Sequence, residues 1–69
     1  MPDPGLAPIR VLTPSTDDVS WTVTLDGAPV NSGVAATAED AEATAVLVAV
    51  SCVFALNILG LSARVDPTE

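Results

Sequence analysis

Hydrophobic and polar residues alternate strictly along residues 19–25, VSWTVTL. Side chains of a β-strand point alternately to its two faces, so this segment would have one apolar and one polar face. The apolar face comprises Val19, Trp21, Val23 and Leu25. Asp26-Gly27 follows, and this dipeptide favours a type I′ turn because both residues tolerate positive φ. The pattern therefore predicts a β-hairpin whose second strand begins at Ala28.

A two-residue turn also predicts the register of the hairpin. Counted outward from the turn, the pairs are Leu25 with Ala28, Val23 with Val30, Trp21 with Ser32 and Val19 with Val34. Pro29 has no N–H to donate, so the second strand should lie at the edge of the sheet. Residues 9–12, IRVL, would then pair with residues 19–25 on their other side. The intervening residues 13–18, TPSTDD, are predicted to form a turn.

A helix is predicted to follow the hairpin. The hydroxyl of Thr37 is suited to accept a hydrogen bond from an amide of the first helical turn. Glu39, Asp40 and Glu42 come next, where carboxylates complement the helix dipole. The helix is therefore expected to begin at about residue 38, and Gly60 is suited to end it through a left-handed cap.

The run of residues 43–63, ATAVLVAVSCVFALNILGLSA, carries no charge. Successive residues of a helix are about 100° apart, so these apolar side chains would surround the axis and leave no wide polar face. A hairpin covers only one side of such a helix, and the rest should be buried by another protein chain or by lipid. The alternative is a helix that breaks near Ser51 and continues as a β-prone segment.

A row of small residues recurs at helical spacing within this segment and predicts close contact between helices, in water or in a membrane. The predicted packing seam consists of Ala41, Ala45, Ala49, Cys52, Val46, Val53, Phe54 and Asn57. The amide of Asn57 is the candidate for fixing the register between two helices, as a buried polar side chain does in coiled coils.

Length and charge narrow the classes of partner. A chain of 69 residues forms one domain at most, and with one cysteine and no histidine an internal disulfide or a histidine-based metal site is excluded. Small folds of this kind gain stability by oligomerisation or from a membrane. The net charge of −7, with two arginines and no lysine, argues against direct binding of nucleic acid, which requires a basic patch.

No pattern in the chain indicates catalysis or a cofactor. Cys52 lacks the histidine base that a nucleophilic thiol requires. Asp17 and Asp18 lack the DxDxDG spacing of a calcium loop, and no glycine-rich phosphate loop is present. The chain is therefore expected to be neither an enzyme nor a metalloprotein.

Residues 21–45 carry a recognisable combination of Trp21, Asp26-Gly27, Gly33 and Glu39-Asp40-Ala41. This combination resembles a hairpin-then-helix module that is common in small proteins of high-GC actinobacteria and their phages. Such modules share no activity, so the resemblance implies no functional residue. The present chain departs from them because an apolar run replaces the usual charged outer face of the helix.

These patterns predict an α+β fold, in which a two- or three-stranded antiparallel hairpin sheet packs on one long apolar helix with extended termini. The domain is expected over residues 9–61, preceded by an extended proline-rich arm at residues 1–8 and followed by a polar tail at residues 62–69.

The function expected from this fold is that of a non-catalytic structural or accessory subunit, which buries its apolar helix in a homo- or hetero-oligomeric assembly such as a phage virion. It would then be cytoplasmic or part of a virion. Two alternatives stay open. One is a single-pass membrane subunit with residues 43–63 in the bilayer, since a helix of this length spans about 31 Å. The other is a small acidic soluble regulator or inhibitor of a host protein.

Overall fold

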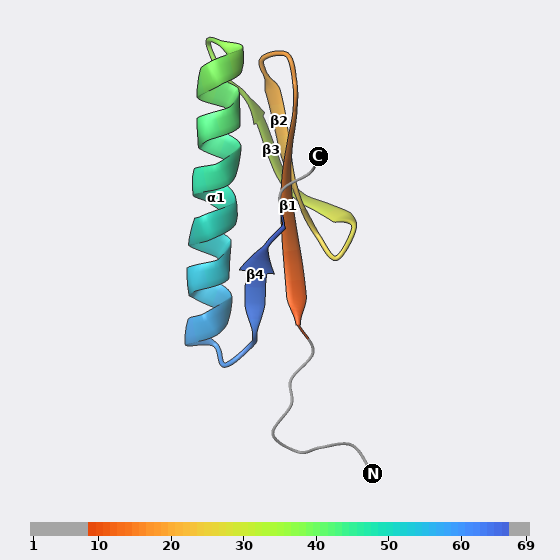
Figure 1. The fold of residues 1–69 in the computed structure, drawn as a ribbon, viewed down its shortest axis with the longest axis vertical. Coiled ribbons are helices and arrows are strands. Elements are labelled where there is room, and N and C mark those ends of the chain that lie inside the picture. The colour runs from red at the N-terminus through yellow and green to blue at the C-terminus, as the bar shows by residue number, and fades with distance from the viewer. Residues whose placement is uncertain (1–8, 67–69) are drawn as a thin grey trace.

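A computed structural model describes residues 9–66 and contains a four-stranded sheet with one helix on one face (Figure 1). In chain order the elements are β1 (Arg10–Asp17), β2 (Ser20–Leu25), β3 (Ala28–Val34), α1 (Ala38–Ile58) and β4 (Ala63–Val65). The strand order is β3-β2-β1-β4, and only β4 pairs in parallel. The predicted α+β class is confirmed. The predicted arm at residues 1–8 lies outside the described residues.

The first strand is longer than the sequence pattern predicts. β1 pairs antiparallel with β2, as expected for residues 9–12, but it continues to Asp17 through the segment predicted as a turn. Backbone groups of Arg10 and Leu12 bond on the β4 side. Backbone N–H groups of every second residue point to the same side of a strand, so the ring nitrogen of Pro14 also lies on the side away from β2. The missing N–H therefore costs no hydrogen bond to that strand. The actual turn is short and relies on Asp18, which has a φ of 58°.

The C-terminal segment predicted as a polar tail contains a strand, and this corrects the expectation for residues 62–66. Residues 63–65 form β4, which pairs in parallel with Arg10–Leu12 at the edge of the sheet. Ala63 and Val65 pack against the core, whereas Arg64 between them is exposed. A parallel neighbour requires a crossover connection, and α1 provides it.

The β2–β3 hairpin keeps the predicted register only near its turn. Leu25 pairs with Ala28 across a turn in which Asp26 and Gly27 both have positive φ, as predicted. Beyond Pro29 a β-bulge shifts the register by one residue, so that Trp21 faces Gly33 rather than Ser32. The other predicted pairs are displaced with it, and Val30 and Val34 are exposed instead of facing the core.

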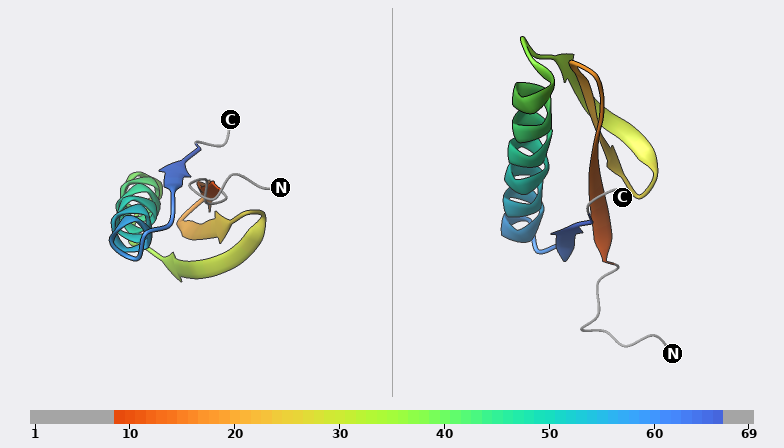
Figure 2. Two further views of the ribbon diagram at one scale, coloured as in Figure 1. Left: turned by 90° about the horizontal axis from the view of Figure 1, so that it is seen from below. Right: turned by 45° about the horizontal axis from the view of Figure 1, so that its top comes forward.

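Two features explain the bulge. Proline cannot donate a ladder hydrogen bond, so pairing is easily interrupted after it. The indole of Trp21 also requires a glycine opposite, because a Cβ at Gly33 would lie 2.7 Å from the Cζ2 atom of that ring. The hairpin then curves away from α1 toward its tip (Figure 2).

The start and end of α1 follow the predicted capping chemistry. The Asp40 N–H donates to the Thr37 hydroxyl at 3.1 Å. At the other end Gly60 has a φ of 86°, its N–H donates to the Asn57 carbonyl, and the Leu61 N–H donates to the Leu56 carbonyl. These are the two bonds of a Schellman motif. The helix is continuous between its caps, so the alternative break near Ser51 is wrong.

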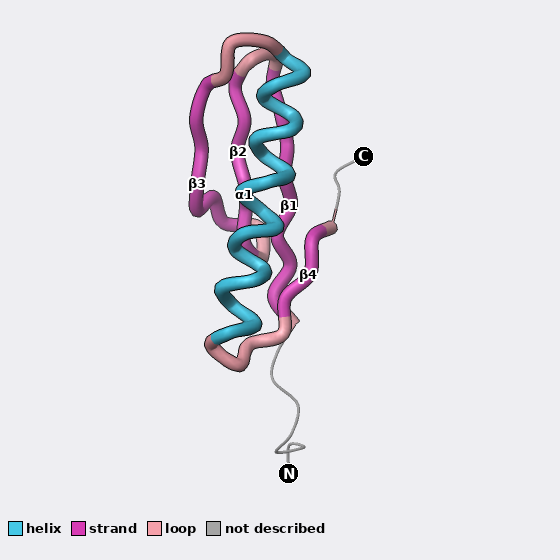
Figure 3. Tube along the Cα trace, turned by 90° about the vertical axis from the view of Figure 1, so that its left-hand side faces the viewer, coloured by secondary structure: helices cyan, strands magenta, loops and turns pink. Residues whose placement is uncertain are grey.

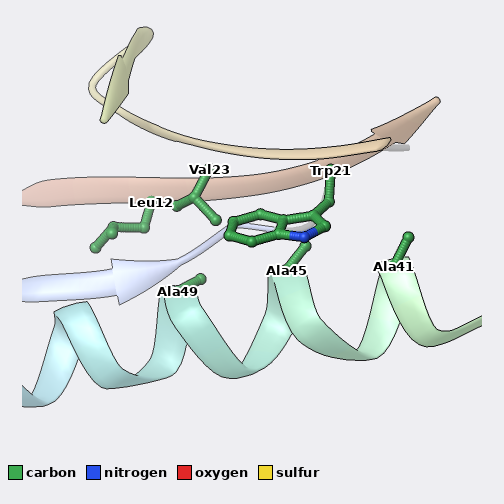
Figure 4. Close-up of a cluster of buried hydrophobic side chains, with 6 residues drawn as sticks. All are labelled: Leu12, Trp21, Val23, Ala41, Ala45 and Ala49. Carbon is green, nitrogen blue, oxygen red and sulfur yellow. The ribbon is translucent and has the colours of Figure 1, made fainter. Parts of the chain in front are cut away.

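The core lies between α1 and the sheet (Figure 4). Leu12, Trp21 and Val23 from the strands are buried against a row of alanines. The helical side of the core consists of Ala41, Ala45 and Ala49. Because alanine has only a methyl group, the helix approaches closely enough for the indole of Trp21 to lie over Ala45. Trp21, which the sequence places on the apolar face of its strand, is thus buried in the core.

The tip of the β2–β3 hairpin is attached to the start of β1 through Asp26. Its carboxylate accepts a hydrogen bond from the Val11 N–H and forms an ion pair with Arg10, each at 2.9 Å. The Val11 hydrogen bond and, after it, the Arg10 guanidinium lower the pKa of Asp26. Asp26 thus supplies both the positive φ of the turn and its connection to the neighbouring strand.

Substitution of Gly33 by alanine tests the packing of the indole. Where a strand glycine has free space, this change stabilises a protein by about 0.4–1 kcal/mol. Here the new methyl group meets the Trp21 ring, and we expect a destabilisation of about 1–3 kcal/mol. Urea unfolding followed by fluorescence of the single tryptophan measures it, with Ser32→Ala on the same strand as control. Equal or greater stability of Gly33→Ala would contradict this packing.

Candidate interaction surface

The exposed large apolar side chains of α1 lie on its side away from the sheet. Figure 3 views the structure from the side on which α1 lies in front of the strands. At about 100° per residue, these positions are centred opposite the buried alanines, and Val46 lies at the margin nearest to them. We call this surface the outer face; it consists of Ala43, Val46, Leu47, Val50, Phe54 and Ile58. Its five large side chains are 44–70 % exposed. A helix that is apolar on every side is normally buried on every side, which makes the outer face a candidate interaction surface.

The N-terminal half of the outer face is hollowed. An open depression of about 560 Å³ runs along the helix there. Its lining is mainly aliphatic and includes two acidic residues: Glu39, Glu42, Ala43, Val46, Leu47 and Val50. Ala43 and the valines in this half have small side chains, whereas the larger Phe54 and Ile58 are exposed on the other half of the helix.

The predicted packing seam is divided between the two sides of α1. Val46, Phe54 and Asn57 are exposed, and Cys52 and Val53 are partly buried at the boundary with the core. Ala41, Ala45 and Ala49 are buried against the chain's own strands. This corrects the prediction for the three alanines, because the sheet occupies the close approach that was assigned to a second helix.

Leu47, Val50 and Ile58 of the outer face do not belong to the seam predicted from the sequence. The relevant signal was the size of the side chains on each side of the helix. A sheet that carries a tryptophan packs best on the side of the helix with the smallest residues, since the indole needs the volume. The large residues are thereby left on the opposite side.

Charge is distributed unevenly along the molecule. The first turns of α1 and the β1–β2 turn lie at the same end of the structure (Figure 1). This end carries five carboxylates, from Asp17, Asp18, Glu39, Asp40 and Glu42. From residue 43 to the end of α1 no charged residue occurs. The outer face therefore runs from an acidic end to a wholly uncharged one.

Two further properties bear on what this surface can bind. Within residues 9–66 no group of three or more histidine, cysteine or acidic side chains is arranged to hold a metal ion. By length and composition α1 could cross a membrane, and 17 % of its most apolar window is buried. A core helix of a soluble protein meets the same criteria of length and composition.

In comparisons with known proteins, no family model, curated protein or solved structure matches this chain.

A matched pair of substitutions tests which side of α1 contacts the sheet. Ala45→Leu inserts a large side chain under Trp21, and we expect it to destabilise the fold by about 1–3 kcal/mol. Ala43→Leu makes the same change two residues away on the outer face, and its expected effect lies within about 0.5 kcal/mol. Urea unfolding of dilute protein measures both, and helix propensity cancels between them. A larger loss for Ala43→Leu would contradict the orientation of α1.

Proposed function

We propose that this protein is a non-catalytic structural or accessory subunit, which docks on another protein surface through the outer face of α1. The observation that carries the proposal is the continuous stripe of large, exposed aliphatic and aromatic side chains on that face. Full burial of one such side chain is worth about 1.5–3 kcal/mol. Covering the stripe therefore gains free energy comparable with the stability of a small domain.

A protein cover is favoured over a membrane-spanning helix because the other side of α1 is already occupied. Trp21, Leu12 and Val23 pack on it. Moving α1 into a bilayer would either expose these residues or carry the sheet into hydrocarbon. In hydrocarbon the free edges of β3 and β4 would have no hydrogen-bond partners, which costs several kcal/mol per group. The packed sheet thus supports docking on protein.

Peripheral attachment to a lipid surface is also disfavoured by the composition of the surface. Helices that lie in a membrane interface carry lysine and arginine on their polar side, and anionic headgroups attract them. The outer face is instead flanked by Glu39 and Glu42, and the chain has a net charge of −7. Anionic lipids would repel this end of the helix.

A single-pass membrane subunit is the second candidate, favoured by the length and apolar composition of α1. It requires α1 to separate from the sheet. The expected place of the protein in a virion stays a prediction, since the proposed docking surface specifies the kind of contact and not the assembly.

The rate at which a thiol reagent labels the outer face, in soluble extract of the cells that produce the protein, tests the proposal. The variant Cys52→Ala/Leu47→Cys carries its single thiol on the outer face, and Cys52→Ala/Ser32→Cys carries it on exposed β3. In detergent-free soluble extract we expect a water-soluble maleimide to label position 47 several-fold more slowly than position 32, with equal rates after denaturation. Native Cys52 is unsuited to this experiment because it lies on the side of α1 that faces the sheet.

Two results would overturn the proposal. Equal labelling of both positions in the soluble extract would mean that the outer face is uncovered. Recovery of the protein in the membrane fraction alone, with detergent needed to release it, would favour the single-pass alternative.

A further inference from the structure

We infer that the outer face is covered by a second copy of this chain, with the two α1 helices antiparallel and the two sheets on the outside. This inference rests on the proposed function and names its partner. It follows from the spacing of the outer-face residues, from the size difference between the two halves of α1, and from the position of the acidic end.

The spacing on the side of α1 opposite the sheet is that of a two-helix seam. Residues there recur at alternating intervals of three and four, the pattern by which one helix packs along another. The seam consists of Asp40, Ala43, Leu47, Val50, Phe54 and Asn57. Its apolar centre is closed at each end by one short polar side chain.

Side-chain size selects the antiparallel alignment. When Phe54 of one copy lies over Ala43 of the other, its ring enters the open depression in the N-terminal half of the outer face. The same alignment brings Leu47 opposite Val50. A two-fold axis repeats each contact, so the bulky half of each helix covers the hollowed half of its partner. A parallel pair would instead oppose Phe54 to Phe54 and leave both depressions empty.

Charge selects the same alignment. A parallel pair would bring together the two acidic ends, each with the carboxylates of Glu39, Asp40 and Glu42. In the antiparallel pair these ends are separated by roughly the length of α1, about 30 Å. That distance exceeds the Debye length of about 8 Å at physiological ionic strength, so the repulsion between them is screened.

The polar ends of the seam complement each other in this alignment. The amide of Asn57 is exposed and makes no hydrogen bond to residues 9–66. It comes opposite Asp40 of the other copy, where its NH₂ group can donate to the carboxylate. A hydrogen bond to a charged group is stronger than one between neutral groups. Because sliding one helix along the other would break this bond, it would fix the register of the pair.

The area available is enough for a dimer of modest affinity. A large side chain offers roughly 100 Å² of apolar surface, and two copies of the outer face together offer on the order of 1,000 Å². Specific interfaces bury about 1,200–2,000 Å² in total, so this dimer lies near the lower limit. We therefore expect it to dissociate on dilution.

Light scattering coupled to size-exclusion chromatography, in buffer without detergent, tests the stoichiometry. We expect dimers at high concentration and monomers on dilution. Phe54→Ala should weaken association by about 30-fold, as expected for a central aromatic residue of an interface. Val34→Ala, which removes an exposed apolar side chain of β3, should leave association unchanged.

Cross-linking tests the orientation. One chain carries Cys52→Ala/Ala43→Cys and the other Cys52→Ala/Phe54→Cys. A mixed dimer places the two thiols opposite each other and keeps one intact Phe54–Ala43 contact. A short bis-maleimide should therefore cross-link the mixture efficiently and the Ala43→Cys chain alone poorly, because its two thiols are 11 residues apart along the paired helices.

A charge exchange tests the register. Asn57→Asp would oppose two carboxylates and should weaken the dimer, whereas Asp40→Asn/Asn57→Asp restores the donor and acceptor with their positions exchanged and should recover it. Circular dichroism of the monomers at low concentration separates loss of association from loss of fold.

The outcomes separate this inference from the proposed function. A monomer that persists at about 1 mM, where a micromolar Kd would be saturated, overturns the dimer. So does a dimer in which the Ala43→Cys chain cross-links to itself best, or an undefined larger species. If the protein is monomeric while position 47 is protected in soluble extract, a different protein covers the outer face, and only the inference about a second copy fails. Free labelling at position 47 in undiluted extract, together with a monomer at about 1 mM, rejects both.

Discussion

The structure depends on the contact between the indole of Trp21 and the alanine side of α1 (Figure 4). The ring has room for a glycine at position 33 and a methyl group at position 45, and a larger side chain at either position would disturb its packing. Once the alanines face the strands, the rotation of α1 about its axis is fixed. Leu47 and Phe54 then point to solvent. The position of the candidate interaction surface is thus a direct consequence of core packing.

Features determined by a few neighbouring residues could be predicted from sequence. The Asp26-Gly27 turn, the Thr37 cap and the Gly60 terminus depend on local φ values and on hydrogen bonds within a few residues of the chain. The alternation of residues 19–25 likewise marks a strand with one apolar face. The predicted α+β class followed from these local signals together with the length of the apolar run.

Features that depend on distant residues could not be predicted in the same way. The bulge after Pro29 is needed because Gly33 must face Trp21 on another strand. β4 is only three residues long and is defined by pairing with the start of β1. The small residues on α1 have a spacing suited both to a second helix and to a sheet, so their predicted contact with a second helix did not reveal which side of α1 faces the strands. Phe54 and Asn57 belong to the predicted seam and are exposed, whereas the exposure of Leu47 and Val50 became apparent only from the orientation of the helix.

The most direct test of this account is a nuclear Overhauser measurement on the indole protons of Trp21, in isotopically labelled protein without detergent. The account predicts strong effects to the methyl group of Ala45 and to the α-protons of Gly33, and none to Phe54. Effects to the side chains of Leu47 or Phe54 would mean that the sheet covers the opposite side of α1. The absence of any effect to α1 would mean that the helix does not pack on the sheet at all.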